Sequence, residues 1–171
     1  MPSLRPVPTA EPALLDPLCD LLIDAVHGGA SVGFLAPLSR DRAAHYWTQV
    51  LKGLDQGLRL WVAEAEGRVV GSVQLALNPR ENGLHRAEVQ KLLVLGAFQG
   101  RGLAGRLMAE VEAATRAEGR TLLVLDTLAG TRSEAIYQHL GWQRVGEIPE
   151  FAAAPDGQLH PTVVFYKRLE P

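Results

Sequence analysis

The spacing of apolar residues changes along the chain from a helical period to an alternating one. In residues 14–27 and 39–52, apolar side chains recur every three or four positions, which predicts two helices. The glycines Gly28-Gly29 and Gly53 follow these segments and are expected to end the helices. From Leu58 onwards the period is two, which predicts strands. The strands are expected at Leu58–Ala65, Arg68–Leu77 and 85–95, with a tight turn at Glu66-Gly67 and a further short strand at 3–7.

The second half of the chain returns to helical spacing and adds a crossover. Four apolar residues spaced four, four and three apart predict a helix at 102–118, with Gly119 as its C-cap. The apolar run 121–125 predicts a strand buried on both faces. A strand–helix–strand unit of this kind is almost always parallel and right-handed. The remaining elements are expected as a helix at 133–140 that ends before Gly141, strands at 143–148 and 162–169, and a turn at Pro155-Asp156-Gly157.

Length and composition fit one folded domain. The 171 residues are 47% hydrophobic and 21% charged, which is ordinary globular composition. A chain of this length favours a single domain over residues 1–171. The element order places the fold in the α+β (mixed α/β) class, with antiparallel strands first and one parallel β-α-β crossover.

The charge balance limits the kinds of partner that are expected, and the cysteine count indicates the cellular compartment. The formal net charge of −2 gives no basic excess, so neither a nucleic acid nor a membrane surface is expected as a partner. Cys19 is the one cysteine, which excludes an intramolecular disulfide and fits a reducing compartment. The histidines lack metal-ligand spacing, so no metal is expected. Prolines interrupt the first dozen residues, so no signal peptide is expected, and the sequence predicts a cytoplasmic protein.

A glycine-rich segment follows the third strand of the meander and opens the next helix. Its three glycines allow a phosphate to approach the backbone, and the free N–H groups of a helix start favour an anion. Arg101 and Arg106 add positive charge. A plain strand-to-helix turn with solvated arginines is the alternative, but three glycines and two arginines within Gly100–Arg106 exceed what a turn needs. We therefore expect the segment 99–106 to bind phosphate.

Two kinds of phosphate ligand fit this segment. Gly100, Gly102 and Gly105 spell G-x-G-x-x-G, and Asp126 follows at the end of the next strand, as in the dinucleotide-binding fingerprint. However, Gly96 rather than Gly100 lies at the strand end, and an antiparallel meander precedes the motif. Too little chain follows for the further β-α-β units of a nucleotide fold. A dinucleotide-binding oxidoreductase is therefore the weaker alternative.

The same segment matches a second signature better. Gln99-Gly100-Arg101-Gly102-Leu103-Ala104 fits Q/R-x-x-G-x-G/A, and Leu92-Leu93-Val94 corresponds to an upstream L-x-V strand end. Further along, Tyr137 and Gly141-Trp142 fit Y-x-x-x-G-F/W. On these motifs, over about residues 86–142, the chain resembles the GNAT superfamily of acetyl-CoA-dependent N-acetyltransferases. The segments 33–40, 87–92 and 145–152 also resemble the tabtoxin-resistance type of small-molecule acetyltransferase.

The resemblance implies a fold, a co-substrate and a set of contacts. It implies a central mixed sheet of about seven strands with helices on both faces, and often a homodimer. It also implies that the strand ending near Val94 splays from its parallel neighbour and leaves main-chain N–H groups for the pantetheine and the acetyl carbonyl. Gly130 departs from the family, which often has a supporting Asn there, so Thr131 or Ser133 would have to replace that contact. The residues assigned to acetyl-CoA are Leu92, Leu93, Val94, Gln99, Gly100, Arg101, Gly102, Leu103, Ala104, Gly105 and Arg106.

Acetyl transfer from a thioester to an amine also needs a proton donor and a proton acceptor. Tyr137 is the candidate general acid for the leaving thiolate, and its place in the motif favours this role over that of a core tyrosine. Many members of the family use a strand Glu as the base, but the commonest position here holds Gln90, which cannot accept a proton. Glu88 is a candidate base because strict alternation places it on the same face as Gln90 and Leu92.

Asp126 is the second candidate base, because it ends the next parallel strand close to the expected splay. Both carboxylates also have a plain structural interpretation, Glu88 as a solvated strand residue and Asp126 as a cap on the following helix. His85 is a weaker third candidate, since a lone His near a strand start is more often structural.

The sequence therefore predicts transfer of an acetyl group from acetyl-CoA to the primary amine of a small molecule, by direct attack in a ternary complex. A catalytically silent acyl-CoA-binding module on the same fold is the alternative, because Gln90 and Gly130 depart from the family pattern. The acceptor pocket is expected around residues 26–46 and 150–161, and the sequence does not identify the amine.

Overall fold

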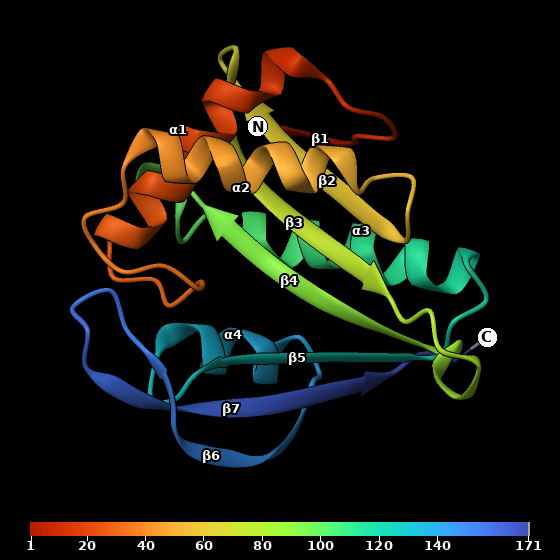
Figure 1. The fold of residues 1–171 in the computed structure, drawn as a ribbon. Helices are drawn as coiled ribbons and strands as arrows, with labels where there is room; N and C mark the ends of the chain where they lie inside the picture. Colours follow the sequence, from red (N-terminus) through yellow and green to blue (C-terminus); the bar gives the residue numbers. More distant parts are fainter. Residues whose placement is uncertain (171) are drawn as a thin grey trace.

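A computed structural model describes residues 1–170 and shows a seven-stranded mixed sheet (Figure 1). The strands lie in the order β1-β2-β3-β4-β5-β7-β6, and every neighbouring pair is antiparallel except β4 with β5. Their bounds are β1 Ser3–Pro6, β2 Leu58–Ala65, β3 Arg68–Leu77, β4 Arg86–Val94, β5 Leu122–Leu128, β6 Gln143–Ala153 and β7 Leu159–Arg168. The predicted mixed sheet with one parallel crossover is confirmed.

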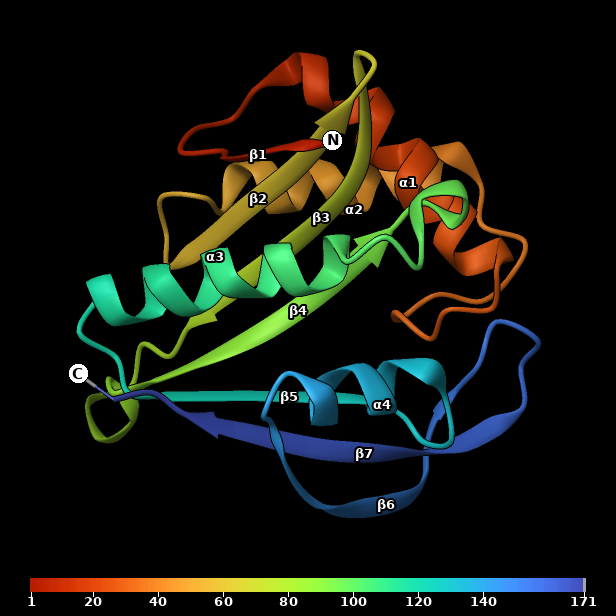
Figure 2. The ribbon, with the colours of Figure 1, turned by 180° about the vertical axis from the view of Figure 1, so that it is seen from behind.

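Helices cover both faces of the sheet, as predicted, but leave part of one face open (Figures 1 and 2). The front face, defined here as the face under α1 (Leu15–His27) and α2 (Arg40–Lys52), is covered over the first four strands in the sheet order. The back face carries α3 (Leu103–Ala117) over β2 to β4 and α4 (Arg132–His139) over β5. Within residues 1–170, no helix covers the front face of β5, β7 and β6.

Local sequence signals explain the elements that were predicted most closely. The hairpin β2–β3 has the predicted bounds, and Glu66 and Gly67 form its turn with φ of 53° and 72°. Two positive φ values are what a two-residue turn between twisted strands requires. Ser39 caps α2 by accepting a hydrogen bond from the Arg42 N–H at 3.3 Å. These are short-range effects, so the sequence alone reveals them.

Three details of the prediction are wrong. The strand β5 is not buried on both faces: Leu123 and Leu125 are buried on the back face, whereas Leu122 and Val124 on the opposite face are only partly buried. The reason is that α1 and α2 do not reach β5. The C-cap of α3 is Glu118, and Gly119 follows it with φ +70°. The strand β6 extends to residue 153 rather than 148, and pairing with β7 accounts for the extension.

The topology excludes the dinucleotide-binding alternative. A doubly wound nucleotide fold needs several adjacent parallel strands, but here β5 pairs with β7 in the antiparallel direction on its other side. In the part of the chain that the structure describes, no helix has both the length and the apolar character needed to span a bilayer.

Candidate functional site

The strands β4 and β5 pair only at one end and then separate. Their ladder joins Arg86 to Leu122, Ala87 to Leu123 and Glu88 to Val124, and it ends there. Beyond this point, residues 89–94 of β4 and 125–128 of β5 face each other without pairing. The predicted splay is therefore present. Backbone N–H and C=O groups along the facing edges of these strands are left for a ligand or for solvent, and leaving such groups without a partner is costly.

A β-bulge at Gln90 and Lys91 lies just beyond the last β4–β5 pair. On the β3 side, Ser72 pairs with Leu93 while Gln74 pairs with Gln90, so β4 contains one extra residue between these pairs. Lys91 absorbs the bulge with φ +48°, in the left-handed region that non-glycine residues rarely adopt. Strained backbone of this kind is common at functional sites.

The bulge places Glu88 and Leu92 on opposite faces of β4, whereas the sequence predicted that they share one face. Glu88 and Gln90 share the front face, as alternation requires, because the residues between and beside them, Ala87 and Val89, are buried on the back face. After the bulge the alternation changes phase. Leu92 therefore packs into the back core with α3, on the face opposite to Glu88, contrary to the prediction. An extra residue inverts every later side chain on a strand.

The glycine-rich loop opens α3 without a side-chain cap. Gly100 and Gly102 both have φ +75°, and Gly102 occupies the N-cap position of the helix. No atom lies within 4 Å of the position that a Cβ on Gly102 would take, so the backbone there is open to a ligand. Free N–H groups and the helix dipole make such a start suited to phosphate.

The arginines near the loop differ in their surroundings. Arg101 stacks over the Phe98 ring, 5.1 Å from its centroid, and its side chain is exposed. Arg106 instead donates a hydrogen bond to the Pro2 carbonyl oxygen at 3.0 Å, which holds its guanidinium toward the N-terminal strand. Arg132, which sequence reasoning missed, extends from the start of α4 so that its Nη2 lies 3.4 Å from the Cβ position of Gly100. The only sequence signal for Arg132 is its position between the glycine-rich segment and the Tyr137 motif.

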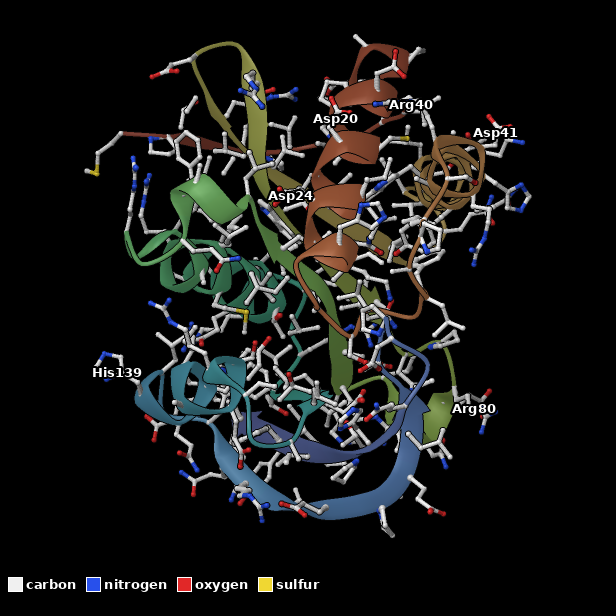
Figure 3. The ribbon with its side chains drawn as sticks, turned by 90° about the vertical axis from the view of Figure 1, so that its left-hand side faces the viewer. Asp20, Asp24, Arg40, Asp41, Arg80 and His139 are labelled. Atoms are coloured by element: carbon white, nitrogen blue, oxygen red, sulfur yellow. The ribbon has the colours of Figure 1, made fainter. Side chains whose placement is uncertain are left out.

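The strand end before the loop is fixed by side chains from elsewhere. The Gln99 side chain donates from Nε2 to the Val94 carbonyl oxygen at 3.1 Å. Asp24 of α1 accepts a hydrogen bond from the Gly96 N–H at 2.9 Å, and Figure 3 shows it on the side of α1 that faces this loop. Leu93 is buried against α1 and α2, whereas Leu92 and Val94 are partly buried on the back face. Together these contacts hold the strand end and the glycine loop in one arrangement.

Tyr137 lies on α4 with its ring in the back core. It is 8% exposed and packs between Trp142 and Phe165, with ring centroids 6.0 and 5.9 Å away. Burial raises the pKa of Tyr137 to about 12, and the charge of Asp126 adds to the shift. The phenol is protonated at neutral pH, as an ordinary tyrosine is, and remains so to a higher pH because of the shift.

The two carboxylates proposed as the base lie on the front face near the splay. Asp126 is two residues beyond Val124, which pairs with Glu88, so all three share that face. Asp126 Oδ2 accepts a hydrogen bond from Thr162 Oγ1 at 2.8 Å, and the N-cap of α4 is Thr131, so Asp126 does not cap that helix. Glu88 is exposed where the β4–β5 ladder ends.

His85 lies at the other end of β4. It precedes the strand and borders a surface hollow with Thr121, Leu122 and Tyr166. The strand runs from there to Val94, so His85 is remote from the open end of the splay. Within residues 1–170, no three His, Cys, Asp or Glu side chains form a group suited to a metal ion.

Lys91 is a residue of the front face that sequence reasoning missed. Its Nζ lies 5.5 Å from the centroid of the Tyr46 ring on α2. Tyr46 is held in place by Gln74, whose Nε2 donates to its hydroxyl at 2.9 Å, and by the edge of the Phe34 ring, 5.4 Å away. Burial lowers the pKa of Lys91, while the charges of Asp126 and Glu88 oppose that shift. Strict alternation places Lys91 on the back face, and the bulge with its positive φ turns the side chain to the front face instead, which explains the omission.

Two loops meet above this part of the front face. The α1–α2 connection and the β6–β7 turn are joined by a hydrogen bond from the Ala36 N–H to the Pro155 carbonyl oxygen at 2.9 Å. Gly33 of the first loop lies close to Lys91, with 3.8 Å between its Cβ position and the lysine Nζ. Both loops fall within the segments 26–46 and 150–161, where the acceptor pocket is expected.

Gly130, at the position where an Asn was expected, forms a backbone hydrogen bond to a side chain of the same chain. The Gly130 N–H donates to Glu134 Oε2 at 2.9 Å, and Glu134 also accepts from Arg144 at 3.1 Å. These two bonds lower the pKa of Glu134, with the Gly130 bond first. Thr131, one of the suggested replacements, donates its hydroxyl to the Leu128 carbonyl oxygen at 2.8 Å.

Comparison with known proteins gives a consistent result. A family model described as an acetyltransferase (GNAT) domain matches residues 56–144. An uncharacterized N-acetyltransferase from the hisH-hisA intergenic region of Azospirillum brasilense is 34% identical over 126 residues, which cover 72% of this chain and 74% of the relative.

Solved structures show the same fold over almost the whole chain. A ribosomal-protein-alanine N-acetyltransferase from Brucella melitensis has a TM-score of 0.80 at 24% identity, covering 98% of this chain and 99% of the other. The Salmonella typhimurium protein yncA, solved with its cofactor acetyl-CoA, has a TM-score of 0.80 at 17% identity, covering 100% of this chain and 95% of the other. At these identities the likeness concerns the fold.

Proposed function

The chain belongs to the GNAT acetyltransferase family, and on that premise we propose that it transfers the acetyl group of acetyl-CoA to the primary amine of a small molecule. One observation carries this proposal. The unpaired edges of β4 and β5 lead directly to an uncapped, glycine-rich helix start, so a place for an extended chain adjoins a place for phosphates. In coenzyme A an extended pantetheine chain is followed by a pyrophosphate, which is the same order.

The residues present fit acetyl-CoA as a co-substrate. Between Gln99 and Arg106, whose own N–H groups are bonded to backbone carbonyls, the loop presents N–H groups and the open backbone at Gly102. Arg101 and Arg132 provide positive charge nearby. The strand end 92–94 supplies backbone groups for the pantetheine and for the carbonyl oxygen of the thioester. Arg106 is proposed as a further phosphate contact, and binding there requires its guanidinium to leave the Pro2 carbonyl oxygen. Acetyl-CoA itself supplies an activated acetyl group.

The front face provides the acceptor side of the reaction. The attacking amine must lose a proton while its nitrogen forms a bond to the acetyl carbon and the carbon–sulfur bond breaks. Asp126 and Glu88 lie on this face at the splay and are the groups proposed to take that proton, directly or through a water. Asp126 is further fixed by Thr162, so its carboxylate has a defined direction.

Tyr137 is proposed to return a proton to the sulfur that leaves. Its phenol is protonated at neutral pH at its ordinary pKa, and burial raises that pKa further, to about 12. Burial also disfavours a thiolate, so a thiolate formed in the same buried place is a stronger base than in water. Burial thus raises both the pKa of the phenol that donates the proton and the pKa of the thiol that forms.

The proposal is tested by acetyl-CoA binding and by release of free thiol over a panel of small amines. We expect micromolar or tighter binding and amine-dependent thiol release. Binding without turnover on any amine would instead favour a silent acyl-CoA-binding module, which Gln90 and Gly130 make worth testing. Binding of NAD in preference to acetyl-CoA would contradict both.

Location and assembly also remain proposals. The single, buried Cys19 fits a cytoplasmic protein, and the family resemblance suggests a homodimer. Fractionation of expressing cells and light scattering of the purified chain test these two points separately from catalysis.

A further inference from the structure

Lys91 places a positive charge on the front face without an ion-pair partner. For residues 1–170, no carboxylate oxygen lies within 4.0 Å of its Nζ, whereas Lys167, the other partly buried lysine of the sheet, is 2.6 Å from Glu112. The side chain is partly buried between β4 and the Tyr46 ring. Its ammonium group is not among the fully buried unpartnered polar atoms of residues 1–170, so it remains accessible from the front face. A partly desolvated charge without a partner carries part of the cost of burial, which contact with an anion would remove.

The backbone is strained in a way that places this charge on the front face. The bulge turns both Gln90 and Lys91 to that face, since Leu92 and Val94 pack on the back. A lysine with φ +48° is uncommon, and the strain persists only where the surroundings enforce it. The ring of Tyr46 offsets part of the cost through a cation–π contact, but it leaves the hydrogen-bond donors of the ammonium free.

The same face carries two negative charges. Glu88 and Asp126 lie on it at the splay, and both act on the lysine electrostatically. An acceptor with an ammonium group alone would be attracted to these carboxylates and would leave Lys91 without a partner. An acceptor with a second, negatively charged group would satisfy both signs of charge.

We propose that Lys91 binds an anionic group of the acceptor, so that the substrate is an amine that also carries a carboxylate or a similar anion. This inference rests on the proposed function. The ammonium group of the substrate lies toward Glu88 and Asp126, and its anion lies toward Lys91 beneath the Tyr46 ring and Gly33. Lys91 in this role is a specificity residue that contacts substrate, and it exchanges no proton.

The test compares free amino acids with their methyl esters, α- and ω-amino acids of several lengths included. The variant is Lys91→Met, which keeps the length of the side chain and removes its charge. Lys52→Met, at the exposed end of α2, is the matched control. Esterification also lowers the pKa of an α-amine, but this affects wild type and variant equally. The change in the acid-to-ester ratio of kcat/KM therefore isolates Lys91.

We expect the wild type to prefer the best acid over its ester by tenfold or more. Lys91→Met should lower kcat/KM for the acid at least tenfold and leave the ester within about threefold, with the KM for acetyl-CoA unchanged. Calorimetric titration of the same acids into the CoA-saturated protein gives a readout that needs no turnover. A protein that binds the acids through Lys91 but acetylates no amine would contradict the proposed function alone.

The inference is overturned if no acid binds or reacts better than its ester in the wild type. It is also overturned if Lys91→Met lowers kcat/KM for acid and ester equally, which is the result for a merely structural lysine. Loss of kcat for both substrates with a changed pH profile would show that Lys91 exchanges a proton instead.

Discussion

Replacing Tyr137 with Phe removes a single oxygen atom from the candidate site. The ring keeps its contacts with Trp142 and Phe165, 6.0 and 5.9 Å away. Within residues 1–170, no hydrogen bond from this hydroxyl contributes to the fold. Removing a hydroxyl that has no hydrogen-bond partner to lose is close to neutral, whereas breaking a buried hydrogen bond would cost about 1–3 kcal/mol. We therefore expect the free energy of unfolding of Tyr137→Phe to lie within about 1 kcal/mol of the wild type at neutral pH.

The effect on turnover should be much larger. A general acid contributes roughly 10²–10⁴-fold to the rate, which corresponds to about 3–5 kcal/mol of the barrier. Most of the loss should be in kcat, because the hydroxyl acts when the thiolate departs and not when acetyl-CoA binds. Steady-state thiol release at saturating amine gives kcat, and calorimetry gives the affinity for acetyl-CoA, which should stay within about twofold.

Alkaline stability provides a second readout of the same hydroxyl. Because the folded state raises the pKa of Tyr137 from 10.0 to about 12, the folded protein holds this proton more tightly than the unfolded chain. The resulting stability is fully present below pH 10 and is lost as the pH rises from 10 to 12, by about 2–3 kcal/mol. Tyr46 has the same raised pKa and contributes in the same range. Urea unfolding at pH 8 and 11 should therefore show a smaller loss of stability in Tyr137→Phe than in the wild type.

A kcat of Tyr137→Phe within about twofold of the wild type would refute the general-acid role. Tyr137 would then be a core residue, and the proton for the thiolate would come from a water held by Glu88 or Asp126. An equal loss of stability at alkaline pH in both proteins would refute the shifted pKa separately.

Three other changes test the rest of the site. Gly102→Ala should lower the free energy of unfolding by about 1–2 kcal/mol, because Gly102 has a φ of +75°. It should also weaken acetyl-CoA binding, measured by calorimetry, at least tenfold. Gly119→Ala is the control: Gly119 has a φ of +70° and equally open space, so the same loss of stability is expected with unchanged binding. Arg132→Ala should weaken CoA binding by about 1.5–3 kcal/mol, as expected for a charge-assisted contact, and should leave the affinity for pantetheine, which lacks the phosphates, unchanged. Asp126→Asn should lower kcat at least tenfold if Asp126 accepts the proton from the amine. A larger loss of kcat in Glu88→Gln would assign that role to Glu88. The pH profiles of kcat/KM for the two variants show which carboxylate titrates as the base.

Much of the fold follows from local sequence signals. The hairpin β2–β3 has the predicted bounds because strict alternation and a Glu66-Gly67 turn act over only a few residues. The second helix begins at its Ser39 cap and ends at Gly53 for the same reason. The glycine-rich loop was also placed correctly at the start of α3.

The errors arise where distant parts of the chain decide the outcome. The open front face of β5 depends on how far α1 and α2 extend over the sheet, which no pattern within β5 reports. Arg132 reaches Gly100 across the splay, from a helix start that is distant in sequence. The extension of β6 depends on its partner strand β7. Alternation, cap residues and turn residues carry none of this information.

The bulge at Gln90 and Lys91 had the largest effect on the predicted site. Strict alternation would have placed Glu88 and Leu92 on one face and Lys91 on the other, in the apolar back core. A lysine there would be strongly disfavoured, so the hydrophobic pattern around residue 91 already contained a conflict. That conflict is the one signal in the sequence from which the bulge was predictable. A charged residue that alternation places on the buried face of a strand indicates a β-bulge next to it.

The bulge also gives a physical reason for the splay. A bulge bends its strand and increases the local twist, and this one follows the last β4–β5 pair at Glu88 by only a few residues. On its β3 side, β4 stays paired through Val94, so the bend separates β4 from its other neighbour, β5. One inserted residue therefore opens the strand edge that would receive the pantetheine and turns Lys91 toward the face from which the acceptor would approach. The same local distortion would thus position both substrates of the proposed reaction, so we expect changes that remove the bulge to affect both binding sites together.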